Sequence, residues 1–137
     1  MKNLFVPYYV AVEAMEHGFD EECLRFYNRT EVLRPSINRD GDNNSYLTGV
    51  VDSDFVAAPT YGQLADWFRR EKKLEITVHT ESNVNEIIGF YFTLYAPMSW
   101  PVLRISLPGP SLDYYECWEE AFANAFSMIK PSKLKKT

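Results

Sequence analysis

Apolar residues recur along this chain at two spacings, one typical of helices and one typical of strands. Steps of three and four residues predict a helix that starts near Pro7, a second that starts after Thr60, and a third from about Tyr114 to Ile129. The expected apolar stripes are Phe5, Tyr8, Val12, Met15 and Phe19; then Tyr61, Leu64, Ala65 and Phe68; then Tyr114, Trp118, Ala121, Phe122, Ala125 and Ile129. Each stripe implies that its helix covers one side of a core.

The residues at the expected helix ends are those that helix ends prefer. Gly18 is a natural stop for the first helix, and Asp113 is the expected N-cap of the last one. Thr60 and Gln63 fit a capping box, in which Thr60 is the N-cap. The polar residues Glu13, Glu16, His17, Gln63, Asp66 and Arg70 are expected away from the apolar stripes or at their edge, and Trp67 at an edge. In segment 58–78 every residue thus has a structural role, so we expect this segment to stabilise the fold and not to form a functional site.

Strict alternation of apolar and polar residues predicts strands. LEITVHT (74–80) and EIIGFYFTLY (86–95) alternate on either side of a five-residue polar loop, which is typical of a hairpin. The apolar set expected beneath the helices is Leu74, Ile76, Val78, Ile88, Phe90, Phe92 and Leu94. VLRISL (102–107) predicts a third strand, and CLRFYN (23–28) with YLTGVV (46–51) predicts a second hairpin around a polar loop. Together these elements predict an α+β fold, an antiparallel sheet covered on one face by about three helices.

Length, charge and cysteine content narrow the class of protein. A chain of 137 residues predicts a single α+β domain over residues 1–130, followed by a basic, flexible tail at 131–137. The net charge of −5 argues against a generally basic surface, so we do not expect nucleic acid as a partner. Two cysteines outside any CxxC pair indicate a reducing compartment. Without a signal-like N-terminus or an apolar run of about 20 residues, we expect a cytoplasmic protein and no membrane partner.

Motifs that carry catalytic or metal chemistry are absent from the sequence. It contains no GxGxxG, GxxxxGK[ST], GxSxG or HExxH pattern, and its two histidines fall in different elements. The stretch from Asn38 resembles a calcium loop at a glance, but Ser45 and Val51 stand where that loop needs Gly and Glu. The acidic run DYYECWEE (113–120) fits the solvent face of a helix. We therefore expect no cofactor, no metal and no catalytic residues, and lean away from an enzyme.

One surface keeps two interpretations open. The sheet face opposite the helices is expected to display Glu75, Thr77, His79, Ile87, Tyr91, Thr93, Tyr95 and Arg104. A solvated face with cross-strand aromatic pairing is the simpler interpretation. Tyr, His and Arg are also residues that binding surfaces favour, which makes Tyr91, Tyr95, His79 and Arg104 the candidate binding residues.

Three stretches resemble a family of small proteins from phages and prophages of gut Bacteroides-type bacteria. They are VPYYVAVEAMEHGFDEECLRFYN, APTYGQLADWFRREKKLEI and DYYECWEEAFANAFSMI, which occur in the family's order and cover about half of the chain. The resemblance implies a bacterial or phage cytoplasmic setting, with no established activity and no assigned catalytic residues. We therefore expect a non-enzymatic phage-type accessory protein that binds a protein partner or itself. The alternative is a small enzyme or ligand-binding domain with its site on the Tyr/His/Arg sheet face.

Overall fold

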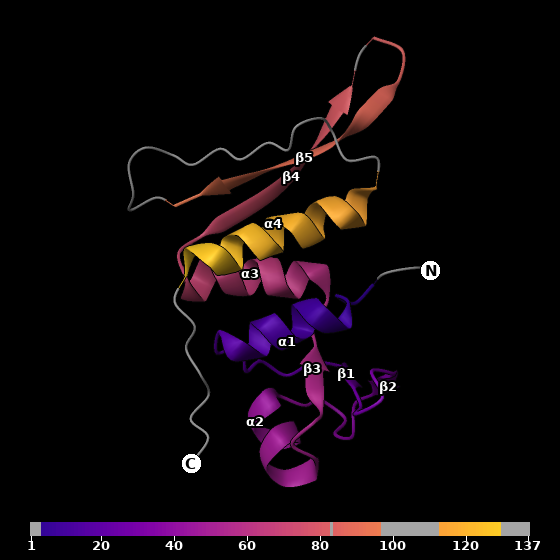
Figure 1. The fold of residues 1–137 in the computed structure, drawn as a ribbon, viewed down its shortest axis with the longest axis vertical. Helices are drawn as coiled ribbons and strands as arrows, with labels where there is room; N and C mark the ends of the chain where they lie inside the picture. The colour runs from indigo at the N-terminus through magenta and orange to yellow at the C-terminus, as the bar shows by residue number, and fades with distance from the viewer. Residues whose placement is uncertain (1–3, 83, 97–112, 130–137) are drawn as a thin grey trace. The chain divides into compact units, whose positions relative to one another are not determined.

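The computed structural model describes residues 4–82, 84–96 and 113–129 (Figure 1). In chain order the elements are α1 (Tyr8–Glu16), β1 (Arg25–Tyr27), β2 (Leu33–Pro35), α2 (Asn44–Tyr46), a π-helical turn η1 (Leu47–Val51), β3 (Val56–Ala58), α3 (Tyr61–Glu71), β4 (Glu75–Ser82), β5 (Ile87–Tyr95) and α4 (Tyr114–Met128). The α+β class with antiparallel strands is confirmed, but the described strands form two sheets instead of one. The expected strand 102–107 lies outside the described residues.

These elements fall into two compact units. The first takes in the described residues up to Leu64, and the second those from Ala65 to Met128. A single domain over residues 1–130 therefore stays a prediction.

The first unit is built on a three-stranded antiparallel sheet in the order β2-β1-β3, with α1 packed against β3. The helix ends as predicted, since Gly18 has φ +92° and Phe19 N–H donates to the Ala14 carbonyl at 2.9 Å. Its predicted stripe is only partly right, because Phe19 is fully buried while Phe5, Tyr8, Val12 and Met15 are half-buried. The helix itself buries Val10, Ala11 and Ala14, and His17 is buried just past its end. The small side chains of Ala11 and Ala14 let α1 pack closely against β3. The sequence prediction selected the large apolar residues and therefore missed these two alanines.

Residues 46–51 are helical, so the predicted strand there is wrong. The Asn43 side chain accepts a hydrogen bond from Tyr46 N–H at 2.8 Å and starts the α2 turn, which continues as η1. Asn44 is fully buried and binds the Phe19 carbonyl at 2.9 Å and Ala57 N–H at 2.8 Å. Strand β3 takes the predicted place of 46–51 beside β1.

The loop with the calcium-like pattern is a polar turn, as expected. The buried Asp42 carboxylate accepts from Ile37 N–H at 2.6 Å and from Asn38 N–H at 3.0 Å. Gly41 has φ +104°, and a Cβ there would stand 2.9 Å from the Cys23 carbonyl oxygen. Asp42 therefore ties its own loop together, and only glycine fits beside it.

The second unit consists of the β4–β5 hairpin, α4 against both of its strands, and the C-terminal part of α3 (Figure 1). The alternation predicted for the hairpin is confirmed for Ile76, Phe92 and Leu94, which are buried, whereas Val78 and Phe90 of the same face are half-buried. Phe68 of α3 contacts two aromatic rings of α4, at centroid distances of 6.1 Å from Phe122 and 4.9 Å from Phe126. Aromatic and aliphatic side chains thus form the core of this unit.

Both predicted helix caps are present, while two side chains of α3 differ from expectation. Thr60 Oγ1 accepts from Gln63 N–H at 3.1 Å, and Asp113 Oδ1 accepts from Tyr115 N–H at 2.8 Å. Gln63 does not simply face water, because its amide donates to the Glu22 carbonyl at 2.9 Å. Trp67 is buried, and its ring has the Lys72 ammonium 5.4 Å above it.

Candidate functional site

The candidate surface is one face of the β4–β5 hairpin, which we call the Tyr–His ladder. It comprises Glu75, Thr77 and His79 of β4 with Tyr91, Thr93 and Tyr95 of β5. The register places these residues on the face opposite Ile76, Phe92 and Leu94, since neighbouring residues of a strand point to opposite sides. Sequence alternation therefore placed these six residues on one face, whereas Arg104 and the side chain of Ile87, also expected there, lie outside the described part of the chain.

Two of the four predicted binding residues meet on the ladder. His79 lies directly opposite Tyr91, and their rings stack with centroids 4.9 Å apart and planes 19° from parallel. His79 Nε2 also lies 2.6 Å from the Thr93 hydroxyl oxygen, so one hydrogen bond orients the imidazole. The stack and the hydrogen bond together hold both aromatic rings in place.

Tyr95, the third predicted binding residue, lies apart from this pair. Tyr95 lies opposite Glu75, four residues further along β5, which is about 13 Å at the rise of an extended strand. Its side chain is 42% exposed. Arg104 lies outside the described residues. The ladder is therefore an elongated surface and not a single convergent constellation.

Neither cysteine is arranged as a nucleophile. Both thiols are buried. Burial, with a smaller effect of the nearby Glu21 carboxylate, raises the pKa of Cys23 to about 12, and burial raises the pKa of Cys117 to about 11. The Cys23 thiol donates to the Glu21 carbonyl and contacts Gln63 Oε1 at 3.7 Å. Because the thiolate is the reactive form, both side chains are structural at neutral pH.

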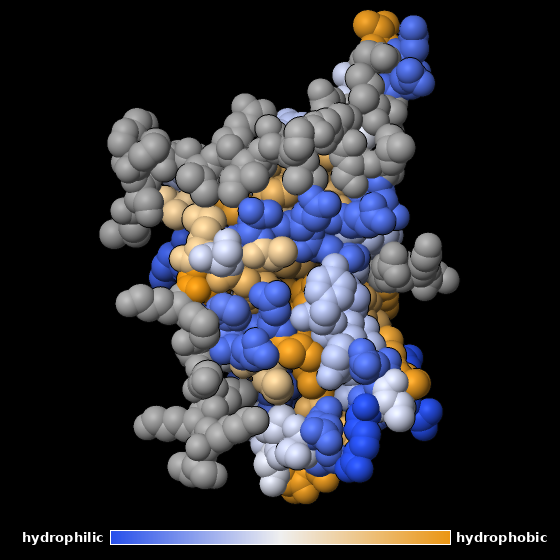
Figure 2. All heavy atoms as spheres, in the orientation of Figure 1, coloured by the Kyte–Doolittle hydropathy of each residue, from blue (hydrophilic) through white to orange (hydrophobic). Residues whose placement is uncertain are grey.

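The remaining polar groups of the described chain form no further constellation. No group of three or more His, Cys, Asp or Glu side chains in residues 4–82, 84–96 and 113–129 is placed to hold a metal ion. His17 is buried with Nδ1 2.7 Å from the Glu13 carbonyl oxygen. The acidic residues Glu116 and Glu120 are exposed on α4, where Figure 2 shows hydrophilic side chains gathered. Within the same residues, no helix is long and apolar enough to cross a membrane.

A second surface, which the sequence pattern did not single out, lies on the β1–β2 hairpin of the first unit. We call it the β1–β2 patch, and its residues are Leu24, Val32, Arg34, Ile37 and Arg39, all exposed. An aliphatic residue in a short strand is normally assigned to the core, so periodicity gave no reason to expect it on the surface.

Comparison with known proteins leaves both surfaces without a precedent. No family model, no curated protein and no solved structure matches this chain. The resemblance to phage-associated proteins therefore stays a prediction that rests on the three quoted motifs.

Proposed function

We propose that this chain is a non-enzymatic protein-interaction module of the phage or prophage accessory type, and that the Tyr–His ladder is its contact surface. The observation that carries the proposal is the oriented His79–Tyr91 stack on the face opposite the hairpin's buried side chains. Side chains that are held in place before binding lose little conformational entropy when a partner arrives. Tyrosine is also among the residues that contribute most to protein interfaces.

The buried, protonated thiols also favour an interaction role over catalysis. A nucleophilic enzyme needs an activated group, and burial makes Cys23 and Cys117 less reactive than free cysteine. The ladder offers aromatic faces and hydroxyl groups, which suit recognition of a protein surface.

Self-association is the first test of this proposal. Sedimentation velocity across a wide concentration range should show a complex for the natural chain, or a stable complex with a partner purified alongside it. Tyr91→Ala should weaken that complex at least about tenfold, which corresponds to about 1.4 kcal/mol, while the melting temperature changes little. Tyr9→Ala, at an exposed tyrosine of α1 in the first unit, is the matched control and should leave the complex intact.

Two results would reject the interaction proposal. One is a chain that stays monomeric and retains no partner at any concentration. The other is a complex that survives Tyr91→Ala and Tyr95→Ala together with unchanged affinity.

The alternative of a small enzyme or ligand-binding domain has one observation in its favour. The His79 imidazole contacts the Thr93 hydroxyl at 2.6 Å, and a general base needs such reach to a hydroxyl group. Under this alternative, Thr93→Val should abolish a small-molecule response of the His79 ring resonances in NMR. Under the interaction proposal, no small-molecule response exists and Thr93→Val weakens the protein complex only mildly.

A further inference from the structure

The Tyr–His ladder has complementary chemistry on the two sides of its centre. The register pairs Glu75 with Tyr95, Thr77 with Thr93, and His79 with Tyr91. The threonine pair therefore lies midway between the other two pairs. Each end of the ladder carries a tyrosine of β5, and β4 adds a carboxylate at one end and an imidazole at the other.

The carboxylate and the imidazole can each form a further hydrogen bond. Glu75 forms no hydrogen bond or ion pair within the part of the chain that the structure describes. The Arg69 guanidinium interacts with it electrostatically but is hydrogen-bonded to Asp66. His79 directs Nε2 to the Thr93 hydroxyl, and its Nδ1 has no partner within residues 4–82, 84–96 and 113–129. Both side chains are half-buried, so each keeps surface that a partner can cover.

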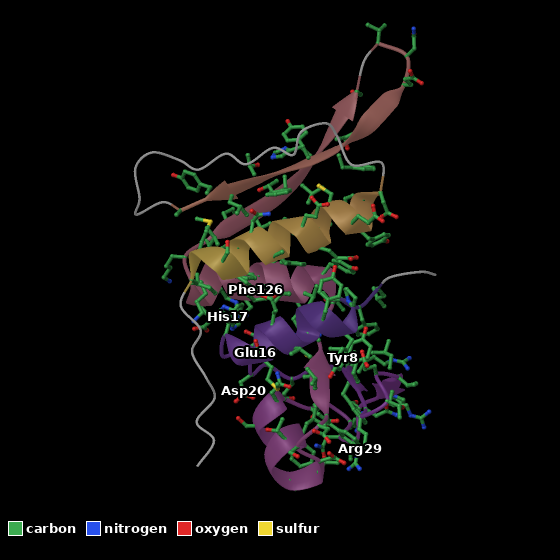
Figure 3. All side chains as sticks on the ribbon, viewed as in Figure 1. Tyr8, Glu16, His17, Asp20, Arg29 and Phe126 are labelled. Atoms are coloured by element: carbon green, nitrogen blue, oxygen red, sulfur yellow. The ribbon has the colours of Figure 1, made fainter. Side chains whose placement is uncertain are left out.

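Several charged side chains elsewhere are already held within their own unit. Asp20 and Arg29 are both labelled in Figure 3. The Asp20 carboxylate accepts from Ser45 N–H at 2.7 Å, and the Arg29 guanidinium donates to Asp52 at 2.5 Å. In contrast, a partner can bind the Glu75 carboxylate without breaking a hydrogen bond of the described chain.

A second copy of the same ladder matches these groups when the two faces pack with opposite strand directions. A two-fold axis that crosses the strands at the central threonine pair sets Glu75 of each copy against His79 of the other. The same axis sets Tyr95 against Tyr91. An axis at Glu75 would bring two carboxylates together, and an axis at His79 would bring two imidazoles together, which favours neither. The central axis joins opposite chemistries, and by symmetry it does so twice.

We propose that a second copy of this chain is the partner of the Tyr–His ladder, and that the two ladders pack face to face about a two-fold axis at the Thr77–Thr93 pair. This inference rests on the proposed function, which makes the ladder a contact surface, and it names the partner. The tautomer with its proton on Nδ1 serves both contacts of His79, because Nε2 then accepts from the Thr93 hydroxyl and Nδ1 donates to Glu75 of the second copy. The six ladder residues are fewer than the roughly 20–30 residues on each side of a stable interface, so we expect a weak dimer that forms at high concentration.

Paired charge variants test the two-fold arrangement. Glu75→Lys sets a lysine against His79 of the other copy, and His79→Glu sets a glutamate against Glu75. Each variant alone should therefore dimerise about tenfold more weakly than the natural chain, or worse. A mixture of the two should form a heterodimer, because the introduced lysine then faces the introduced glutamate while the natural Glu75 faces the natural His79. Sedimentation velocity should find that heterodimer within about threefold of the natural affinity.

A matched control separates this pairing from general charge attraction. Glu71→Lys makes the same change of charge at an exposed residue of α3 outside the ladder. Mixed with His79→Glu, it should restore no affinity, and equal recovery would overturn the inference. Thermal melts check that each variant is folded. The natural chain supplies a test without substitution, since the NMR resonances of the His79 ring should shift with protein concentration, and a dimer that leaves them unchanged would also overturn the inference.

This inference and the proposed function fail in different ways. A natural chain that stays monomeric but retains another partner through Tyr91 rejects the second copy and leaves the contact surface intact. A dimer whose mixed variants associate no better than either variant alone rejects the axis at the threonine pair. An axis along the strands, which sets Glu75 against Tyr95, would give that result. A complex that survives Tyr91→Ala and Tyr95→Ala together rejects the contact surface, and this inference with it.

Discussion

Asn44 connects three segments of the first unit through a single buried amide. Its Nδ2 donates to the Phe19 carbonyl and its Oδ1 accepts from Ala57 N–H. Asn44→Ala leaves both backbone groups without this partner, so we expect a loss of about 2–6 kcal/mol in the free energy of unfolding, at about 1–3 kcal/mol per buried group. Urea denaturation measures this. Asn124→Ala, on the outer side of α4, should change the stability by less than about 0.5 kcal/mol, and equal effects would contradict the role of Asn44.

Tyr91 and Phe92 are neighbours in β5, and their side chains lie on opposite faces of the hairpin. Phe92 is fully buried, and Phe92→Ala should lower the free energy of unfolding by roughly 3–5 kcal/mol because it leaves a cavity. Tyr91 stacks on His79 across the strands, and Tyr91→Ala should lower it by only about 0.2–1 kcal/mol. Guanidinium denaturation of both variants makes the comparison. Large and equal losses would mean that the ladder belongs to the core, which would remove the contact surface proposed for this chain.

The N-terminus of α3 depends on one side-chain hydrogen bond. Thr60 Oγ1 accepts from Gln63 N–H at 3.1 Å, and the Gln63 side chain bonds elsewhere, to the Glu22 carbonyl. Thr60→Ala should therefore destabilise the chain by about 1 kcal/mol. Thr60→Ser keeps the hydroxyl and should therefore retain most of the stability that Thr60→Ala loses. Chemical denaturation of the Thr60→Ala and Thr60→Ser variants tests the cap. A Thr60→Ala variant as stable as the natural chain would show that water replaces the Thr60 hydroxyl as the acceptor for Gln63 N–H.

Elements with long, regular patterns could be predicted from the sequence. The α3 and α4 helices, their caps at Thr60 and Asp113, and the β4–β5 hairpin all combine a local stop or start signal with a clear period. The same alternation put His79 and Tyr91 on one face, while the register that sets them opposite each other comes from the structure. For Tyr95 the sequence supplied the face but not the distance from His79.

Elements whose formation depends on distant partners could not be predicted. Strands β1, β2 and β3 have three residues each, too few for an alternating pattern to be distinguished. The helical turn at 44–51 is held by Asn44, whose partners Phe19 and Ala57 are 25 and 13 residues away. The exposed Leu24 was equally unpredictable, because its exposure depends on which strands pair around it.

Each of the two units contains one buried thiol, and the rate at which a reagent modifies that thiol shows how readily its unit opens. Cys23 belongs to the first unit and Cys117 to the second. At pH 8 a thiol-specific reagent such as DTNB should modify the native chain at least about a hundredfold more slowly than the unfolded chain. That factor follows from the pKa of Cys117, about 11 against an ordinary 9.0, which lowers the thiolate fraction by two powers of ten. Rapid modification of either native thiol would mean that its unit opens readily.

The same pKa shifts predict how stability changes in alkaline solution. Burial raises the pKa of Cys23 from 9.0 to about 12, so the folded chain keeps a proton that the unfolded chain releases. The stability that this thiol contributes is complete below pH 9 and falls as the pH rises toward 12, because the unfolded state then binds fewer protons than the native state. Cys23→Ala removes this ionisation, and its free energy of unfolding should decline less steeply above pH 9 than that of the natural chain. Denaturation curves at pH 7, 8, 9 and 10 give the two slopes directly. Identical slopes would show that the Cys23 thiol ionises as readily in the folded chain as in the unfolded one, and would contradict its assignment to the closed core of the first unit.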